Sequence, residues 1–408
     1  MQRIPFLRDS HNHLFTYSSL FSNNVDLFNI TKKNEALSLL NILPSDKLNV
    51  ATGWLDNYFD FSLQELNDLP PTLLIHNSLH KYIFNDKAEI HIREKLPEFV
   101  DNRYNQTWIE KNLMKLLSFA AKLNKFSLSL FEKTRQDFLN KGVCFASDMY
   151  VDNTDVFNFL QQYDNQQFTE IWTDYTFYKT LSAEHRNLAA GFKIFLDGAI
   201  GAKSAAISDV KVAWNPVLNY TQNELNLELE KLLAEKKDIA IHCIGDVAIE
   251  QALNSLTKLK QKINSKIRLE HVQFINKKQA YTAKDLGLIL SMQPNFNSDS
   301  IIYSDRLTKD FLHANNPFRM LIDDCCFVPG NDLIFGSDGM PSGVCEAINQ
   351  SLFPPIDGQK LELEEFVSAY CTNSYENFIE LEISNLQRKV ECKIQLSEGS
   401  KNCKDNNY

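Results

Sequence analysis

Two histidines near the start of the chain, His11 and His13, are separated by one residue in the segment Asp9-Ser10-His11-Asn12-His13. On an extended strand, side chains alternate between the two faces, so both imidazoles point the same way. Both can therefore reach one metal ion. This spacing predicts a metal site, and the alternative is a chance placement of the two histidines on a surface turn.

Four more residues that can bind a metal or move a proton stand at the ends of short apolar runs. They are Lys193, His242, His271 and Asp338. Four neutral imidazoles and a carboxylate suit a borderline-soft divalent ion such as zinc, and manganese, iron or cobalt accept the same ligands. The alternatives are that His242 is a core histidine satisfied by Asp246, and that Lys193 forms an ion pair with Asp197.

Eight short apolar segments have the pattern of parallel strands buried on both faces. They span residues 5–10, 143–148, 168–173, 192–196, 239–243, 267–269, 288–292 and 333–337. Amphipathic helical patterns such as 225–236 and 248–258 separate many of them. Eight strand–helix units predict an α/β fold, a closed (β/α)8 TIM barrel with its active site at the carboxyl ends of the strands.

One interval breaks this rhythm, because roughly 130 residues separate the first two predicted strands, far more than a normal connection. Two amphipathic helices are expected there at 108–123 and 128–140, the second ended by Gly142 at the C′ position. We expect residues of about 49–141 to form an insertion over the barrel mouth rather than a separate lobe. Residues 1–383 then form the barrel, with a helix at 363–379, and residues 384–408 a polar tail that frays.

Composition limits the classes of partner. The formal net charge of −10 argues against nucleic acid, which requires clustered Lys and Arg. No apolar run reaches the ~18–20 residues that span a bilayer, and the first residues lack the apolar region of a signal peptide. Eight cysteines without a CxxC pair fit reduced thiols. We therefore expect a cytoplasmic protein that acts on a small molecule; a homo-oligomer is left open.

Six segments together resemble the amidohydrolase superfamily, in particular the branch that contains N-substituted formamide deformylases. They lie at residues 9–14, 191–198, 241–246, 268–273, 291–294 and 335–338. The resemblance runs from residue 5 to about 380. Most relatives also carry a small β-sandwich around the barrel. With few residues before the first strand and little strand character after Ile383, we expect this sandwich to be lost or truncated.

The resemblance implies a site with one or two divalent ions. His11 and His13 would hold one ion together with Asp338, and His242 and His271 the second. Lys193 matches a lysine that in this family reacts with CO2, so that its carbamate bridges both ions. A metal-bound hydroxide would attack an amide carbonyl while Asp338 acts as general base, which amounts to hydrolysis of a carbon–nitrogen bond.

Three residues are weaker candidates for contacts around the metal or the substrate. Asp197 lies in a glycine-containing turn, Asp246 is expected to orient a loop or an imidazole, and the resemblance places His80 in the pocket, with an exposed loop position as the alternative. A deaminase or cyclic-amide hydrolase on the same barrel is the nearest rival activity. A non-catalytic regulatory or scaffold protein on a decayed barrel is the rival from another class.

Overall fold

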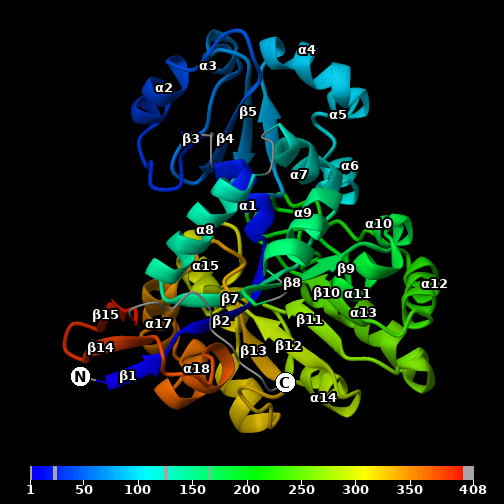
Figure 1. Cartoon of the computed structure of the whole chain (residues 1–408), viewed down its shortest axis with the longest axis vertical. Helices are drawn as coiled ribbons and strands as arrows, with labels where there is room; N and C mark the ends of the chain where they lie inside the picture. Colours follow the sequence, from blue (N-terminus) through cyan, green and yellow to red (C-terminus); the bar gives the residue numbers. More distant parts are fainter. Residues whose placement is uncertain (1, 22–24, 124–126, 165–166, 398–408) are drawn as a thin grey trace.

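The computed structural model describes residues 2–21, 25–123, 127–164 and 167–397. At its centre, eight parallel strands form one sheet in the order β13-β12-β11-β10-β9-β8-β7-β2. They are β2 (Leu7–Asn12), β7 (Val143–Asp148), β8 (Thr169–Thr173), β9 (Ala189–Phe195), β10 (Asp238–Cys243), β11 (Ile267–His271), β12 (Ile289–Met292) and β13 (Leu333–Phe335). The sheet curls into a nearly closed barrel (Figure 1), which confirms the predicted fold class.

The barrel closes where the first strand meets the last. The buried Asp9 carboxylate accepts hydrogen bonds from the Ser337 amide at 2.8 Å, the Ser337 hydroxyl at 2.5 Å and the Asn12 side chain at 2.8 Å. The Asp338 amide donates to the His11 carbonyl at 2.7 Å. A Cβ at Gly336 would lie 2.3 Å from the His11 backbone nitrogen, so only glycine allows the first and last strands to approach this closely.

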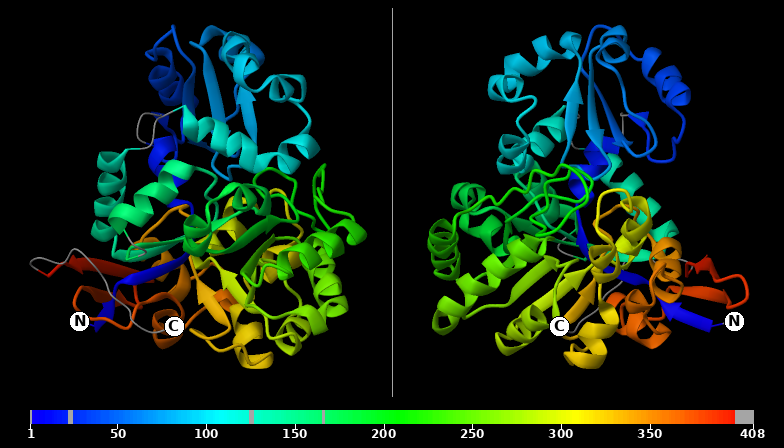
Figure 2. Two further views of the ribbon diagram at one scale, coloured as in Figure 1. Left: turned by 45° about the vertical axis from the view of Figure 1, so that its right-hand side comes forward. Right: turned by 180° about the vertical axis from the view of Figure 1, so that it is seen from behind.

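Helices surround the barrel (Figure 2). They are α9 (Thr154–Phe159), α10 (Tyr175–Thr180), α11 (Ala183–Leu188), α12 (Gln222–Leu233), α13 (Asp246–Lys258), α14 (Lys277–Asp285), α15 (Asp299–Ile302), α16 (Lys309–Ala314), α17 (Val344–Leu352) and α18 (Leu363–Tyr370). In α13 the apolar stripe of Ile249, Ala252 and Leu256 is fully buried, as expected for a helix packed on a sheet.

The chain between β2 and β7 builds an α/β lobe of its own, drawn in blue to cyan in Figure 1. Its sheet has the order β3-β4-β5-β6, from β3 (Val25–Asp26), β4 (Asn49–Trp54), β5 (Thr72–His76) and β6 (Tyr82–Phe84), with the last pair antiparallel. Its helices are α2 (Lys33–Asn41), α3 (Leu63–Asp68), α4 (Asp86–Lys95), α5 (Pro97–Asp101), α6 (Gln106–Lys111) and α7 (Leu113–Lys122), while α1 (Leu14–Phe21) and α8 (Leu128–Asn140) connect the lobe to the barrel. Phe131 and Phe138 of α8 pack in the core of the barrel. The lobe therefore begins well before the expected residue 49.

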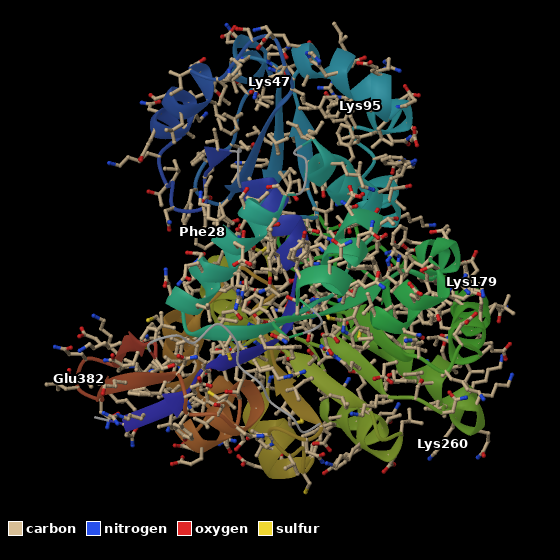
Figure 3. The ribbon with its side chains drawn as sticks, viewed as in Figure 1. Phe28, Lys47, Lys95, Lys179, Lys260 and Glu382 are labelled. Carbon is tan, nitrogen blue, oxygen red and sulfur yellow. The ribbon has the colours of Figure 1, made fainter. Side chains whose placement is uncertain are left out.

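The helix expected at 128–140 and its glycine terminator are confirmed. α8 spans Leu128–Asn140, and Gly142 follows at a φ of 78°. The helix expected at 108–123 is divided at Asn112 into α6 and α7. The lobe meets the barrel at a boundary that includes Phe28, whereas Lys47 and Lys95 lie toward the lobe's far end (Figure 3).

A small antiparallel sheet flanks the barrel, in the order β1-β14-β15. Its strands are β1 (Gln2–Pro5), β14 (Phe378–Ser384) and β15 (Lys389–Gln395). The expectation of a structureless tail from residue 384 is therefore wrong as far as residue 395, and residues 398–408 lie outside the described part of the chain. The helix expected at 363–379 ends at Tyr370 instead, because Ile379 pairs with Ile4 in the sheet. The β-sandwich of relatives was expected to be lost or truncated, and this three-stranded sheet is what the structure has beside the barrel.

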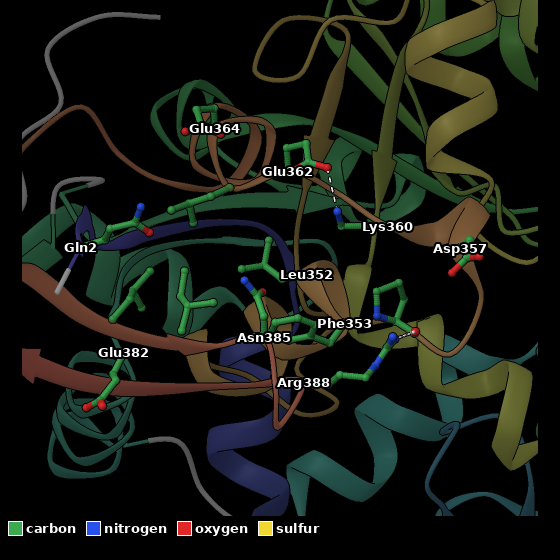
Figure 4. A pocket seen from close by; sticks show the side chains of 14 residues that line it. Gln2, Leu352, Phe353, Asp357, Lys360, Glu362, Glu364, Glu382, Asn385 and Arg388 are labelled. Carbon is green, nitrogen blue, oxygen red and sulfur yellow. Dashed lines mark hydrogen bonds and ion pairs between the residues drawn. The ribbon is translucent and has the colours of Figure 1, made fainter.

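A hollow of about 740 Å³ lies beside this small sheet (Figure 4). Two of its charged side chains are engaged: Lys360 pairs with Glu362 at 2.9 Å, and Arg388 donates to the Pro354 carbonyl at 3.1 Å. None of the candidate metal ligands lines it. Across the described ranges, no helix has both the length and the apolar character that a bilayer crossing requires.

We predict that the small sheet contributes to the stability of the barrel. Ile379 is fully buried and its methyl group lies against Gly142, so Ile379→Ala should lower the free energy of unfolding by roughly 2–5 kcal/mol. Urea denaturation measures this change. Leu386→Ala, at a residue 96% exposed, is the control and should change stability by less than about 0.5 kcal/mol. Equal effects of the two substitutions would contradict the prediction.

Candidate metal centre

Three of the predicted ligands meet at the carboxyl ends of β2 and β13. The ligand atoms of His11, His13 and Asp338 all lie within 4.8 Å of one another, and all three residues are buried. Asp338 Oδ1 is 3.5 Å from His11 Nε2 and 3.4 Å from His13 Nε2. Within the ranges that the structure describes, this is the one such group of three.

The other three predicted residues lie beside this group. Lys193 Nζ, on β9, is 3.3 Å from His11 Nε2. The His271 ring, at the end of β11, is 4.7 Å from that of His11 and 4.6 Å from that of His242 on β10, measured between centroids. Six residues from five strands or strand ends therefore converge on one end of the barrel, although the five strands are far apart in the sequence.

A buried carboxylate that the sequence reasoning did not single out holds His11 in place. Glu270 Oε2 is 2.5 Å from His11 Nδ1, and Arg268 Nε donates to Glu270 Oε1 at 2.8 Å. With Nδ1 engaged, the lone pair of His11 Nε2 is directed toward Asp338 and Lys193. Hydrogen bonds of this kind fix the tautomer of metal-binding histidines.

An unusual backbone turn directs His271 into the same space as Glu270. Neighbouring residues on a strand normally face opposite sides, but His271 has a φ of 71° and Val272 a φ of 40°. The left-handed region is strained for a β-branched valine, and such strain is concentrated at functional sites. Gln293 Oε1 accepts a hydrogen bond from His271 Nδ1 at 2.7 Å, which leaves His271 Nε2 free.

The two predicted outer-sphere carboxylates differ in placement. Asp197 accepts hydrogen bonds from the Ile244, Gly245 and Ala206 amides at 2.9 Å, and its Oδ1 is 3.4 Å from His242 Nε2. Asp197, and not Asp246, is therefore the carboxylate beside the His242 ring. Asp197 is not the ion-pair partner of Lys193. Asp246 accepts from the Ser208 amide at 2.9 Å, so it orients a loop.

His80 is buried at the site, not exposed on a loop. It comes from the inserted lobe, and its ring lies 5.6 Å from that of His242. Its Nδ1 is 2.6 Å from Glu110 Oε2, a second functional candidate that the sequence reasoning missed. Glu110 also binds the Ser204 hydroxyl and accepts from Gln106 Nε2 at 2.8 Å. The lobe therefore contributes a histidine–carboxylate pair to the barrel mouth.

Burial and charge set the protonation of these groups. Burial lowers the pKa of His11 and of His271 well below the usual value, so both imidazoles are neutral and able to bind a metal. Burial also lowers the pKa of Lys193 to about 8. For Asp338 burial acts in the opposite direction, but His11 and His13 outweigh it and lower the pKa, so this carboxylate is ionised at neutral pH.

A cavity of about 340 Å³ opens directly onto the cluster. His80, His242, His271 and Asp338 contribute to its wall, and Phe28 and Tyr58 reach it from the lobe. Its volume lies in the range of small-molecule sites.

The residues present fit a divalent ion. His13 Nδ1 is a buried nitrogen without a hydrogen-bond partner in the part of the chain that the structure describes, while His13 Nε2 faces Asp338. His11, His13 and Asp338 offer two neutral nitrogens and one carboxylate oxygen, a donor set that zinc and related ions accept. Lys193, His242 and His271 provide further donors alongside.

Comparison with known proteins agrees with this geometry. Residues 4–347 match a model described as the amidohydrolase family. YtcJ of Bacillus subtilis (strain 168) is 31% identical over 134 residues, which is 32% of this chain and only 25% of that protein's length.

Two solved structures are similar in fold, each titled an uncharacterized metal-dependent hydrolase. The one from Pyrococcus horikoshii OT3 has a TM-score of 0.63 at 20% identity and covers 86% of this chain and 74% of its own. The one from Pyrococcus furiosus has a TM-score of 0.61 at 17% identity, and the match covers 90% of this chain and 80% of that chain. At these identities the likeness concerns the fold.

We predict that Gln293→Leu weakens metal binding. Loss of the acceptor for His271 Nδ1 frees the ring to rotate, and the metal affinity should fall 10–100-fold. Competition with a chromophoric chelator measures it. Gln251→Leu removes another buried glutamine, which donates to the Tyr220 carbonyl away from the cluster, and should leave the affinity unchanged. An unaltered affinity in Gln293→Leu would refute the role given to Gln293.

The His80–Glu110 pair should make stability depend on pH. Burial opposes the charged imidazole, but Glu110 outweighs burial and raises the pKa of His80. The stabilisation from charged His80 is thus fully present below the unfolded pKa of about 6.5 and is lost as the pH rises through the folded pKa. Glu110→Gln should therefore cost about 1–3 kcal/mol at pH 6 and less at pH 9.

Urea unfolding at the two pH values measures this difference. Glu89→Gln is the control, because Glu89 pairs with Arg93 at the surface of the same lobe, and it should have little effect at either pH. A cost that is equal at both values, or larger at pH 9, would contradict the assignment.

Proposed function

Because this chain belongs to the amidohydrolase family, whose model it matches over residues 4–347, we propose that it hydrolyses an amide-type carbon–nitrogen bond in a small molecule with the help of a divalent metal ion. The observation that carries the proposal is the buried group of His11, His13 and Asp338, of which Asp338 lines a cavity. The narrower assignment to the formamide deformylase branch stays a prediction.

His11, His13 and Asp338 are the residues that would hold a divalent ion, which when bound would supply a water of lowered pKa and polarise the carbonyl of an amide. Asp338 is ionised and partly faces the cavity, so it accepts a proton at a carboxylate oxygen and returns it to the leaving nitrogen. Glu270 keeps His11 in the required tautomer throughout. His80, with Nδ1 on Glu110, has Nε2 free to donate a hydrogen bond to the substrate.

A second ion and a modified lysine complete the proposal. His242 and His271 lie side by side next to Lys193, where a carbamate on Lys193 would reach both groups of ligands. Formation of a carbamate needs the neutral amine. The burial that lowers the pKa of Lys193 to about 8 supports this chemistry, because it raises the neutral fraction at physiological pH.

We predict about two zinc or manganese ions per purified chain, and both metal and hydrolysis should be lost in Lys193→Ala. Elemental analysis and a panel of N-acyl and N-formyl amines measure the two quantities. Lys237→Ala is the matched control, because Lys237 binds the Ala189 carbonyl at the opposite end of the barrel, and it should retain both properties.

The same experiment separates the rival functions. Hydrolysis of aminated aromatic rings or cyclic amides in place of the linear panel would favour a deaminase or cyclic-amide hydrolase. A chain free of metal after growth in supplemented medium, and inactive on every compound, would favour a non-catalytic scaffold.

A further inference from the structure

The cavity wall carries a carboxylate that the proposed reaction does not use. Asp299 is the first residue of α15 and lines the cavity together with Tyr303, one helical turn later. Its Oδ2 accepts a hydrogen bond from Gln273 Nε2 at 3.0 Å. In the described part of the chain, no lysine, arginine or histidine side chain forms an ion pair with Asp299.

A second acceptor on the same wall has no partner. Gln273 is 1% exposed and lines the cavity. Its Nε2 donates to Asp299 and, at 3.0 Å, to Asn315 Oδ1, which fixes the orientation of the amide group. No group among the described residues donates a hydrogen bond to its Oε1. A buried acceptor left unsatisfied costs about 1–3 kcal/mol, which a ligand that donates a hydrogen bond would recover.

The remaining wall suits a cation. No lysine or arginine is among the described residues that line the cavity, whereas Glu346 adds another carboxylate. The rings of Phe296 and Tyr303 also line it, and aromatic faces attract ammonium groups. Apart from His80 beside His242, whose pKa Glu110 raises against the effect of burial, a substrate carboxylate would find no positively charged side chain among the described lining residues.

We propose that Asp299 and Gln273 bind a protonated amine of the substrate, so that the substrate class is an amide that also bears an alkylammonium group. The inference rests on the proposed hydrolytic function of the same site. Gln273 follows His271 by two residues, so their Cα atoms are at most about 7 Å apart. The amine of the substrate therefore lies close to the reacting carbonyl, and a short carbon chain is enough to link the two groups. Monoacylated short diamines have this form.

The test compares three amides on the metal-loaded protein: N-acetyl-1,4-diaminobutane, its neutral isostere N-acetylpentylamine, and N-acetyl-4-aminobutanoate. We expect kcat/KM for the amine-bearing amide to exceed that for the neutral one at least tenfold, and the carboxylate to be the poorest substrate. In Asp299→Asn the ratio of amine-bearing to neutral amide should fall below about threefold. Asp310→Asn, at an exposed residue of α16 outside the cavity, should keep the wild-type ratio.

Equal kcat/KM values for the three amides, or a ratio unchanged in Asp299→Asn, would overturn the subsite while leaving the hydrolytic function intact. If no amide is hydrolysed, the proposed function fails, and calorimetry with 1,4-diaminobutane then decides on the subsite. Binding to the wild type that weakens at least tenfold in Asp299→Asn supports it. Absence of binding, or equal binding by both proteins, overturns it.

Discussion

The seam between the first and last barrel strands is the constraint on which the rest of the structure depends. Asp9 holds Ser337 and Asn12 through a buried carboxylate, and the Asp338 amide is bound to the His11 carbonyl. These contacts bring residues more than 300 positions apart into one group of ligands. Without this closure, Asp338 would have no fixed position relative to the two first-strand imidazoles, and the site would lose its only carboxylate among the expected ligands.

The polar network beneath the cluster keeps its donors in a usable state. Arg268 balances Glu270, and Glu270 holds His11, so a charge that would be costly in isolation is paired and hydrogen-bonded. Because of the left-handed turn at His271, Glu270 can join this network while the next residue, His271, lines the cavity. Burial then lowers the pKa of both imidazoles, which favours metal binding over protonation.

Much of the barrel could be predicted from sequence because buried parallel strands leave continuous apolar runs, each followed here by a polar residue. Glu270 was missed because strand alternation places it opposite His271, and the turn that reverses this leaves no sequence signal. β15 was missed because every second residue, from Lys389 to Lys393, is charged and only Val390 of the strand is buried. The lobe's sheet was not predicted because its pairing depends on long-range contacts, whereas the nearby helix α8 follows local periodicity.

The division of the cavity between barrel and lobe has an evolutionary consequence. The donors that would hold the ion are rooted in barrel strands, whereas His80, Tyr58 and Phe28 belong to a lobe with its own sheet. Mutations in the lobe can therefore change the part of the cavity wall that contacts the substrate without altering the residues that would bind the ion. Divergence among homologues should accumulate faster in the lobe, and recombination of lobes between homologues offers a route to new specificities on an inherited catalytic base.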